Sequence, residues 1–388
     1  MKRIHSLIII FFALVGPIHA ELLYNSTWNY TLDLPEGFEL VATDGVDSFQ
    51  YTHSFMPITT IIKSYSFDKY ASSKETIQAS FTQINATALS EIDSVDWQNQ
   101  DCSIAMFSMQ FEGVSYEGWA FSCSLPSKKG MVLLLTYATA EKADNCQQFL
   151  LSVLDSFYLG TENIKNPGAI TSYAFPSTED ISYIVHIADK DIPVTMDKEA
   201  AMANEFVIER EYAILTLYSN SELWREAWQR YYRMIYRDSY LRLQQASFEI
   251  YSQLYPLAKE IDPEHTNREL AQILLTWTQG FSYEREKTNS DFANLPSIIS
   301  GDGSDCDSRS MLLSVLLAHM NCQTMMFVSA EFSHALFGIA TEGSKGKNAH
   351  IVVDGTSYLL GETTGHVDLG LIAVEMSDIT KWISVLDF

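Results

Sequence analysis

The chain has 388 residues, 47% of them hydrophobic, and its 49 acidic and 25 basic residues give a formal net charge of −24 at pH 7. This acidity argues against nucleic acid and anionic membrane surfaces as partners, because both repel a negatively charged protein. The length and the apolar content are sufficient for two packed domains of ordinary size.

The first twenty residues have the pattern of a secretory signal peptide. Lys2 and Arg3 precede an apolar run at 7–15, and the small residue Ala20 ends the segment at a position suited to cleavage. The apolar run is too short to span a bilayer comfortably, and no later segment is apolar enough to do so. We therefore expect a signal peptide at 1–20, no membrane span, and a mature protein that is secreted or periplasmic.

Residues 21–160 are predicted to form one α/β domain in which strands and helices are mixed. We expect strands at 28–40, 49–53, 60–65, 103–111, 114–122 and 131–137, and helices at 74–84 and 141–157. The Leu-Pro-Glu-Gly-Phe opening at 34–38, the late Leu-Leu-Thr-Tyr strand and the final helix ending in Asp-Ser-Phe resemble PsbP-like domains. That resemblance implies an antiparallel sheet packed by helices, and partner binding rather than catalysis.

Three cysteines lie in this first domain. If residues 112 and 113 form a two-residue hairpin turn, Cys102 lies directly opposite Cys123, and a cross-strand disulfide is geometrically possible. Pairing of Cys123 with Cys146 is the competing possibility, and three reduced, buried thiols are the third. No cysteine or histidine cluster has the spacing of a zinc site, so no metal is predicted.

Residues 161–204 are predicted to hold a linker and leading strands, and residues 205–217 a further strand. The charged triplet at 209–211 is interpreted as a solvated patch. Helical patterns follow at about 223–236, 239–261 and 267–280. Aromatic residues at helical spacing in the first of these helices are interpreted as core rather than as a stacking platform.

The run at 301–310 reads Gly-Asp-Gly-Ser-Asp-Cys-Asp-Ser-Arg-Ser and places Cys306 in the first turn of an apolar helix. The unpaired N–H groups and the dipole of a helix start favour a thiolate. Asp305 and Asp307 act in the opposite direction, and the sequence leaves the balance open. Ser304 or Asp305 is the predicted N-cap.

A histidine and a carboxylate follow on predicted strands. His334 lies in a strand-like run, and Glu362 ends a strand at 356–361 that is expected to pair with 351–353 across an Asp-Gly turn. A cysteine, a histidine and an acid together form a nucleophile, a base and an orienting group. The alternatives for the acid are Asp354 and Asp368. The less favoured alternatives for the base are His319, His350 and His366.

The runs at 277–283 and 301–310, with His334 and the Glu-Thr-Thr run at 362–364, resemble the bacterial transglutaminase-like superfamily. The resemblance implies a papain-like α+β core over 205–388. It assigns Cys306 as the nucleophile, His334 as the general base and acid, and Glu362 as the orienting group. It also implies that Gln279, together with the backbone N–H of Cys306, donates to an oxyanion.

Two functions follow from these expectations. The first is an exported enzyme with a cysteine nucleophile that acts on amide bonds, as a peptidase or amidase if water resolves the thioester and as a transglutaminase if an amine does. The alternative is a non-catalytic binding or scaffold protein with a degenerate transglutaminase-like domain. Both have a protein or peptide as substrate or partner, and neither needs a cofactor, since the sequence contains no phosphate-binding loop or ligand cluster.

Overall fold

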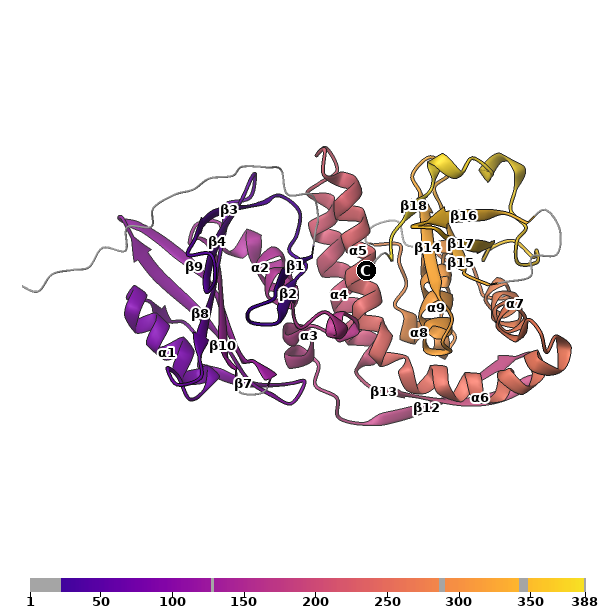
Figure 1. Cartoon of the computed structure of the whole chain (residues 1–388), viewed down its shortest axis with the longest axis horizontal. Coiled ribbons are helices and arrows are strands. Elements are labelled where there is room, and N and C mark those ends of the chain that lie inside the picture. Colours follow the sequence, from indigo (N-terminus) through magenta and orange to yellow (C-terminus); the bar gives the residue numbers. More distant parts are fainter. Residues whose placement is uncertain (1–21, 127–128, 286–289, 342–347, 387–388) are drawn as a thin grey trace, which may run out of the picture. The chain divides into compact units, whose positions relative to one another are not determined.

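The computed structural model describes residues 22–126, 129–285, 290–341 and 348–386, and the predicted signal peptide lies outside them. The chain forms two compact units (Figure 1). Among the described residues, the first contains those within 22–164, 168–174 and 216–227, and the second contains those within 165–167, 175–215 and 228–386. Both units combine helices with antiparallel sheets, which confirms the α+β class.

The first unit is built on an eight-stranded antiparallel sheet in the order β3-β4-β5-β10-β9-β8-β6, with β7 also paired to β8. Its strands are β3 (Phe38–Thr43), β4 (Ser48–His53), β5 (Ile58–Ser66), β6 (Thr87–Ala88), β7 (Asp93–Trp97), β8 (Gln100–Phe111), β9 (Val114–Ser124) and β10 (Gly130–Thr139). A small sheet joins β1 (Leu23–Asn25), β2 (Tyr30–Leu32) and β11 (Phe157–Leu159). The helices are α1 (Ser73–Ile84), α2 (Gln147–Asp155) and α3 (Ala169–Ala174).

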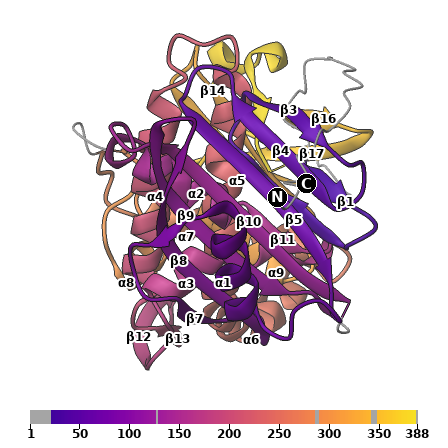
Figure 2. The same cartoon turned by 90° about the vertical axis from the view of Figure 1, so that its left-hand side faces the viewer.

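Helix α1 lies over β8, β9 and β10 (Figure 2). Its inward residues Ile77 and Phe81 pack with Phe107, Leu133 and Leu135. Residues of β10 that point to the other face are buried as well. Burial on both faces is the reason why this strand reads as an unbroken apolar run instead of an alternating one.

The β8–β9 hairpin has the predicted register, and Cys102 lies opposite Cys123. Two-residue turns at 98–99 and 112–113 close the hairpins on either side of β8. Along such hairpins, hydrogen-bonded and non-hydrogen-bonded pairs of residues alternate. Counted from the turn at 98–99, Cys102 and Val95 form a hydrogen-bonded pair between β8 and β7. Cys102 and Cys123 therefore form a non-hydrogen-bonded pair, whose Cα separation of about 4.5 Å lies within the range for disulfides. Both residues are buried free thiols in the structure.

The second unit holds a five-stranded antiparallel sheet in the order β16-β17-β15-β14-β18. Its strands are β14 (Thr324–Ser329), β15 (His334–Ile339), β16 (His350–Val353), β17 (Thr356–Gly361) and β18 (Ile383–Ser384), and a separate hairpin joins β12 (Asp180–Ile187) and β13 (Lys190–Asp197). The longer helices are α4 (Ala200–Thr216), α5 (Trp224–Arg242), α6 (Gln244–Ile261), α7 (Thr266–Gln279) and α9 (Cys306–His319), and α8 (Leu295–Ser300) is short.

Helix α9 packs against β14 and β15 and also contacts α6 and α7 (Figure 1). This central position explains its apolar sequence, because every residue from Met311 to Leu317 is buried. Within the described ranges, the structure contains no helix with the length and apolar character that crossing a membrane requires.

The predicted strand at 205–217 is wrong, because these residues belong to helix α4. The predicted solvated patch is also wrong for Arg210 and Glu211, which are each only 1% exposed. Glu211 accepts from the Nε of Arg210 at 2.8 Å and from an Nη of Arg230 on α5 at 2.6 Å. The two charges are buried because they form an ion-paired group between two helices.

Candidate active site

Cys306 is the first residue of α9 and is 5% exposed. Of the two predicted caps, Asp305 is the one that caps the helix. Its Oδ1 accepts from the backbone N–H of Ser308 at 2.9 Å and from the hydroxyl of the same residue. This cap fixes the first turn of the helix, and with it the position of the thiol.

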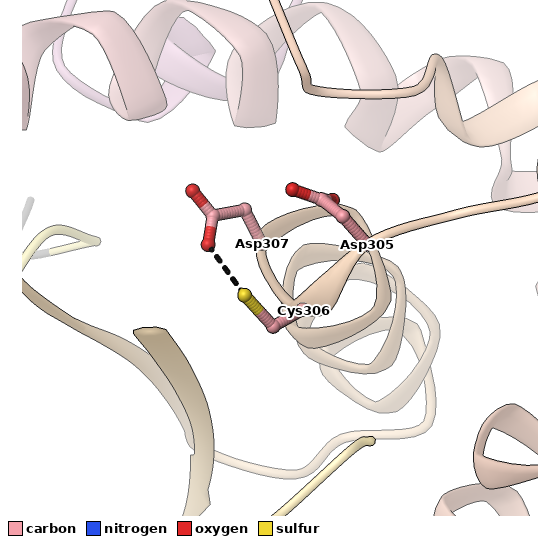
Figure 3. A group of neighbouring side chains, drawn as sticks. All are labelled: Asp305, Cys306 and Asp307. Carbon is pink, nitrogen blue, oxygen red and sulfur yellow. Dashed lines mark hydrogen bonds between the residues drawn. The ribbon is translucent and has the colours of Figure 1, made fainter. Parts of the chain in front are cut away.

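The thiol of Cys306 donates a hydrogen bond to Oδ1 of Asp307 at 3.2 Å (Figure 3). The hydroxyl of Tyr232, on α5, donates to Oδ2 of the same carboxylate. Burial and the carboxylates of Asp307 and Asp305 raise the pKa of Cys306 well above its usual value, against a lowering contribution from the backbone N–H of Ala335. Burial and the two carboxylates thus outweigh the effect of the helix start, and they favour the neutral thiol of Cys306 over the thiolate.

The flanking carboxyl groups are themselves perturbed. Burial and the neighbouring Asp307 raise the pKa of Asp305 to about 7. Burial also raises the pKa of Asp307, although the hydrogen bonds from Tyr232 and Cys306 oppose the shift. The surroundings of the thiol therefore disfavour additional negative charge.

His334 and Glu362 form a direct pair, with 2.7 Å between Nε2 and Oε2. The other carboxylate oxygen of Glu362 accepts from the backbone N–H of Thr364 at 2.8 Å and from its hydroxyl at 2.7 Å. Burial opposes ionisation of Glu362, but the hydrogen bonds from His334 and Thr364 prevail and lower its pKa. Because Nε2 is bound to the acid, Nδ1 is the ring nitrogen left to exchange a proton with a thiol.

The sheet explains how this pair arises. Strand β15 begins at His334, β17 ends at Gly361, and the two strands are antiparallel neighbours. The backbone N–H of Ala335 reaches the sulfur of Cys306, so the beginning of β15 lies against the helix start. In the part of the chain that the structure describes, the hydrogen bond of the thiol goes to Asp307 and not to His334.

The residues named as alternatives for the acid and the base lie outside the pair formed by His334 and Glu362. Asp354 lies in the turn between β16 and β17, with a φ of 47°, and Asp368 is exposed. His319 contacts the carbonyl of Tyr240 and His350 that of Asn348, both at 2.7 Å, while His366 is exposed.

Gln279 does not have the predicted role of an oxyanion donor. Its Nε2 donates to the carbonyl oxygens of Glu362 and Val367, both at 2.8 Å. An amide nitrogen carries two N–H groups, and both are engaged here. The side chain instead ties the end of α7 to the segment that follows Glu362, which leaves the backbone N–H of Cys306 as the remaining predicted donor.

Arg309 is a residue whose role the sequence did not reveal. It is 1% exposed and donates to the carbonyl oxygens of Phe281, Ser304 and Thr363 at 3.0–3.2 Å, and to the hydroxyl of Ser304 at 3.0 Å. It therefore joins the loop before Cys306 to the loop after Glu362. A lone arginine inside an otherwise apolar helix was the available signal.

Asp305, Cys306 and Asp307 also form a group whose potential ligand atoms lie within 4.8 Å of one another (Figure 3). Both carboxylates already accept protein hydrogen bonds, from Ser308 in one case and from Tyr232 and Cys306 in the other. We interpret the group as part of the thiol site.

No family model matches the chain, and no curated protein does. Several solved structures are similar to part of the chain. PsbP from Synechocystis is 14% identical, covering 38% of this chain and 97% of that one, with a TM-score of 0.30. The Ran-binding protein Mog1p of Saccharomyces cerevisiae is 15% identical, covering 37% and 96%, with a TM-score of 0.28. LpqN, involved in cell envelope biogenesis of Mycobacterium tuberculosis, is 10% identical, covering 36% and 90%, with a TM-score of 0.27.

Proposed function

We propose that the chain is an exported thiol enzyme that acts on amide bonds of a protein or peptide, with Cys306, His334 and Glu362 as its reacting groups. The observation that carries the proposal is the 2.7 Å contact between His334 and Glu362 at the start of β15. The residue after His334 contacts the sulfur of Cys306, which opens α9. A nucleophile, a base and an orienting acid thus come from three separate elements, as in the transglutaminase-like superfamily that the sequence resembles.

The reaction would proceed through a thioester. The sulfur of Cys306 attacks the amide carbon, and the thiol proton passes to Nδ1 of His334 and then to the leaving amine as the C–N bond breaks. Water or a second amine then attacks the thioester and loses its proton to His334. The C–S bond breaks as a carboxylic acid or a new amide is released, and His334 returns the proton to the sulfur of Cys306. Glu362 holds the imidazole in orientation and stabilises its charged form.

A non-catalytic binding role is the second candidate, and one observation favours it. The resting thiol is buried, its pKa is raised, and it donates to Asp307. A working nucleophile requires a thiolate, so catalysis must overcome this arrangement.

Alkylation kinetics distinguish the two functions. The rate of iodoacetamide reaction at Cys306 would be followed by mass spectrometry from pH 5 to 10 in the wild type, His334→Ala and Glu362→Gln. Cys322 provides an internal control, because burial alone raises its pKa to about 11. For an enzyme, we expect His334→Ala to slow the reaction of Cys306 at pH 7 by about tenfold or more, with no effect on Cys322.

An unchanged profile in His334→Ala, with Cys306 reacting only at alkaline pH, would contradict the enzyme and support the binding role. A reactive thiol that depends on both partners would justify a search for the substrate, with hydroxylamine to trap the acyl-enzyme.

A further inference from the structure

A cavity of 290 Å³ adjoins the thiol site within the second unit. His334 and Asp307 form one part of its lining. The aromatic side chains that line it are Tyr212, Trp228, Tyr231 and Tyr232. Sites for whole small ligands start at about 300 Å³, so this cavity suits a single side chain better than a complete cofactor.

The charges around the cavity are unevenly compensated. Arg285 and Asp291 also line it and neutralise each other, with 2.5 Å between Nε and Oδ2. Asp307 has different partners. In the described ranges its hydrogen-bond donors are the hydroxyl of Tyr232 and the thiol of Cys306, and both are neutral groups.

In the proposed reaction, this arrangement leaves negative charge near Cys306 without a compensating cation. Forming a thiolate at Cys306 places a further negative charge beside the acidic side chains of Asp305 and Asp307, in a buried setting where like charges repel strongly. The imidazolium of His334 is already paired with Glu362. A cation brought by the substrate would offset the excess charge, and the cavity lies where such a cation would meet Asp307.

We propose that the cavity binds a basic side chain, lysine or arginine, of the peptide substrate, and that this cation contacts Asp307 and stacks on the surrounding rings. A carboxylate among aromatic faces is the chemistry that recognises alkylammonium and guanidinium groups. The bound cation also competes with the thiol for the Asp307 carboxylate, which otherwise accepts the hydrogen bond of the thiol. Binding of the correct substrate therefore makes Cys306 more reactive. This specificity rests on the proposed function, because it matters only if Cys306 is a nucleophile.

Three thiol reagents of different charge test the proposal without a known substrate. They are 2-aminoethyl, methyl and 2-sulfonatoethyl methanethiosulfonate, which are cationic, neutral and anionic. In each case the sulfur of Cys306 forms a mixed disulfide and methanesulfinate leaves. The quantity measured is the ratio of the second-order rate constants of the cationic and neutral reagents at Cys306, by mass spectrometry, in 0.15 M salt to screen distant charges.

We expect Asp307→Asn to lower this ratio about tenfold, which corresponds to ~1.4 kcal/mol. Trp228→Leu should lower it by a smaller factor while leaving every charge in place. Asp302→Asn is the matched control, because it removes one exposed acidic charge from the loop that precedes Cys306 and should leave the ratio unchanged. A ratio that stays constant in both cavity variants, or that falls equally in Asp302→Asn, would overturn the proposal.

The ratio of the two rate constants tests the cavity proposal independently of the proposed function. The neutral reagent reports whether Cys306 depends on His334, and the cation preference reports on the cavity. A thiol that depends on His334 without a cation preference would contradict the cavity proposal alone. A cation preference without dependence on His334 would support a cation-binding site and contradict the enzyme.

Discussion

Both units bury histidine and cysteine side chains, but the groups that contact these side chains differ between the units. In the first unit, Nε2 of His53 contacts the carbonyl of Glu36 at 2.7 Å, and its Nδ1 accepts from the backbone N–H of Met56 at 3.0 Å. In the second, His334 is paired with a carboxylate. The cysteines differ likewise, since Cys102 faces another thiol, whereas Cys306 faces Asp307.

The difference shows that the partner, and not the residue type, sets the chemistry. Burial lowers the pKa of His53 to about 4, against a raising contribution from the carbonyl of Glu36. That ring is fixed as a neutral part of the core. The ring of His334 is instead held by a carboxylate, with 2.7 Å between its Nε2 and Oε2 of Glu362.

The largest expected effect is a loss of folding stability in the second unit. Arg309→Met removes a donor from three carbonyl oxygens and should reduce the free energy of unfolding of this unit by about 3–5 kcal/mol. Urea denaturation followed by hydrogen exchange of each unit would measure it. Arg268→Met, which removes a single 3.4 Å ion pair, should cost less than about 1 kcal/mol. Equal effects of the two changes would contradict the bridging role of Arg309.

The next effect belongs to the first unit. The pKa of His53 is lower in the folded state than its unfolded value of about 6.5, so its contribution to stability is complete above that pH and is lost as the pH falls toward 4. The loss should reach about 3 kcal/mol, at 1.36 kcal/mol for each pKa unit. Urea midpoints at pH 7 and pH 4.5 would show it, and His53→Asn should flatten the dependence. A dependence that survives this substitution would identify another group as its source.

The paired thiols of the first unit provide a third test. Oxidation by a disulfide reagent such as oxidised glutathione should join Cys102 to Cys123, with two protons and two electrons passing to the reagent, which is released as two molecules of reduced glutathione. The bond should stabilise the first unit by about 2–3 kcal/mol and leave the second unchanged. Peptide mapping without reductant and urea midpoints with and without reductant would check this. A bond between Cys123 and Cys146, or reductant sensitivity that persists in Cys102→Ser, would contradict the pairing.

The smallest effect concerns Glu362. Thr364→Val removes the hydroxyl bond to this carboxylate and keeps the backbone bond, so the pKa of Glu362 should rise toward its ordinary value. Because a lowered pKa stabilises the fold above the unfolded pKa and that stability is lost as the pH falls, the variant should lose about 1 kcal/mol at pH 7 and less at pH 3. Thr364→Ser should restore the wild-type value. A loss that is independent of pH would show that the hydroxyl acts only through packing.

Local patterns predicted the elements well where burial and propensity agree. The β8–β9 hairpin, the long helices α6 and α7 and the helix that Cys306 begins all follow from spacing and turn residues. The hairpin turn at Asp354 was predicted as well, and it fixes the register between β16 and β17.

The failures share a physical cause. Helix α4 resembled a strand because of its β-branched and aromatic residues, and its helical state depends on burying Arg210 and Glu211 with Arg230 of another helix. The roles of Gln279 and Tyr232 depend on partners 83 and 75 residues away in the chain. Contacts over such separations leave no periodicity in the sequence.

The ties made by Arg309 and Gln279 have a consequence for biosynthesis. Arg309 joins the loop before Cys306 to the carbonyl of Thr363, and Gln279 binds the carbonyl of Val367, which lies 88 residues further along the chain. A chain synthesised from its N-terminus therefore carries Cys306 long before the strand that ends beside Glu362 exists. The contacts of Arg309 with Thr363 and of Gln279 with Val367 can form only after residues 363–367 have been synthesised.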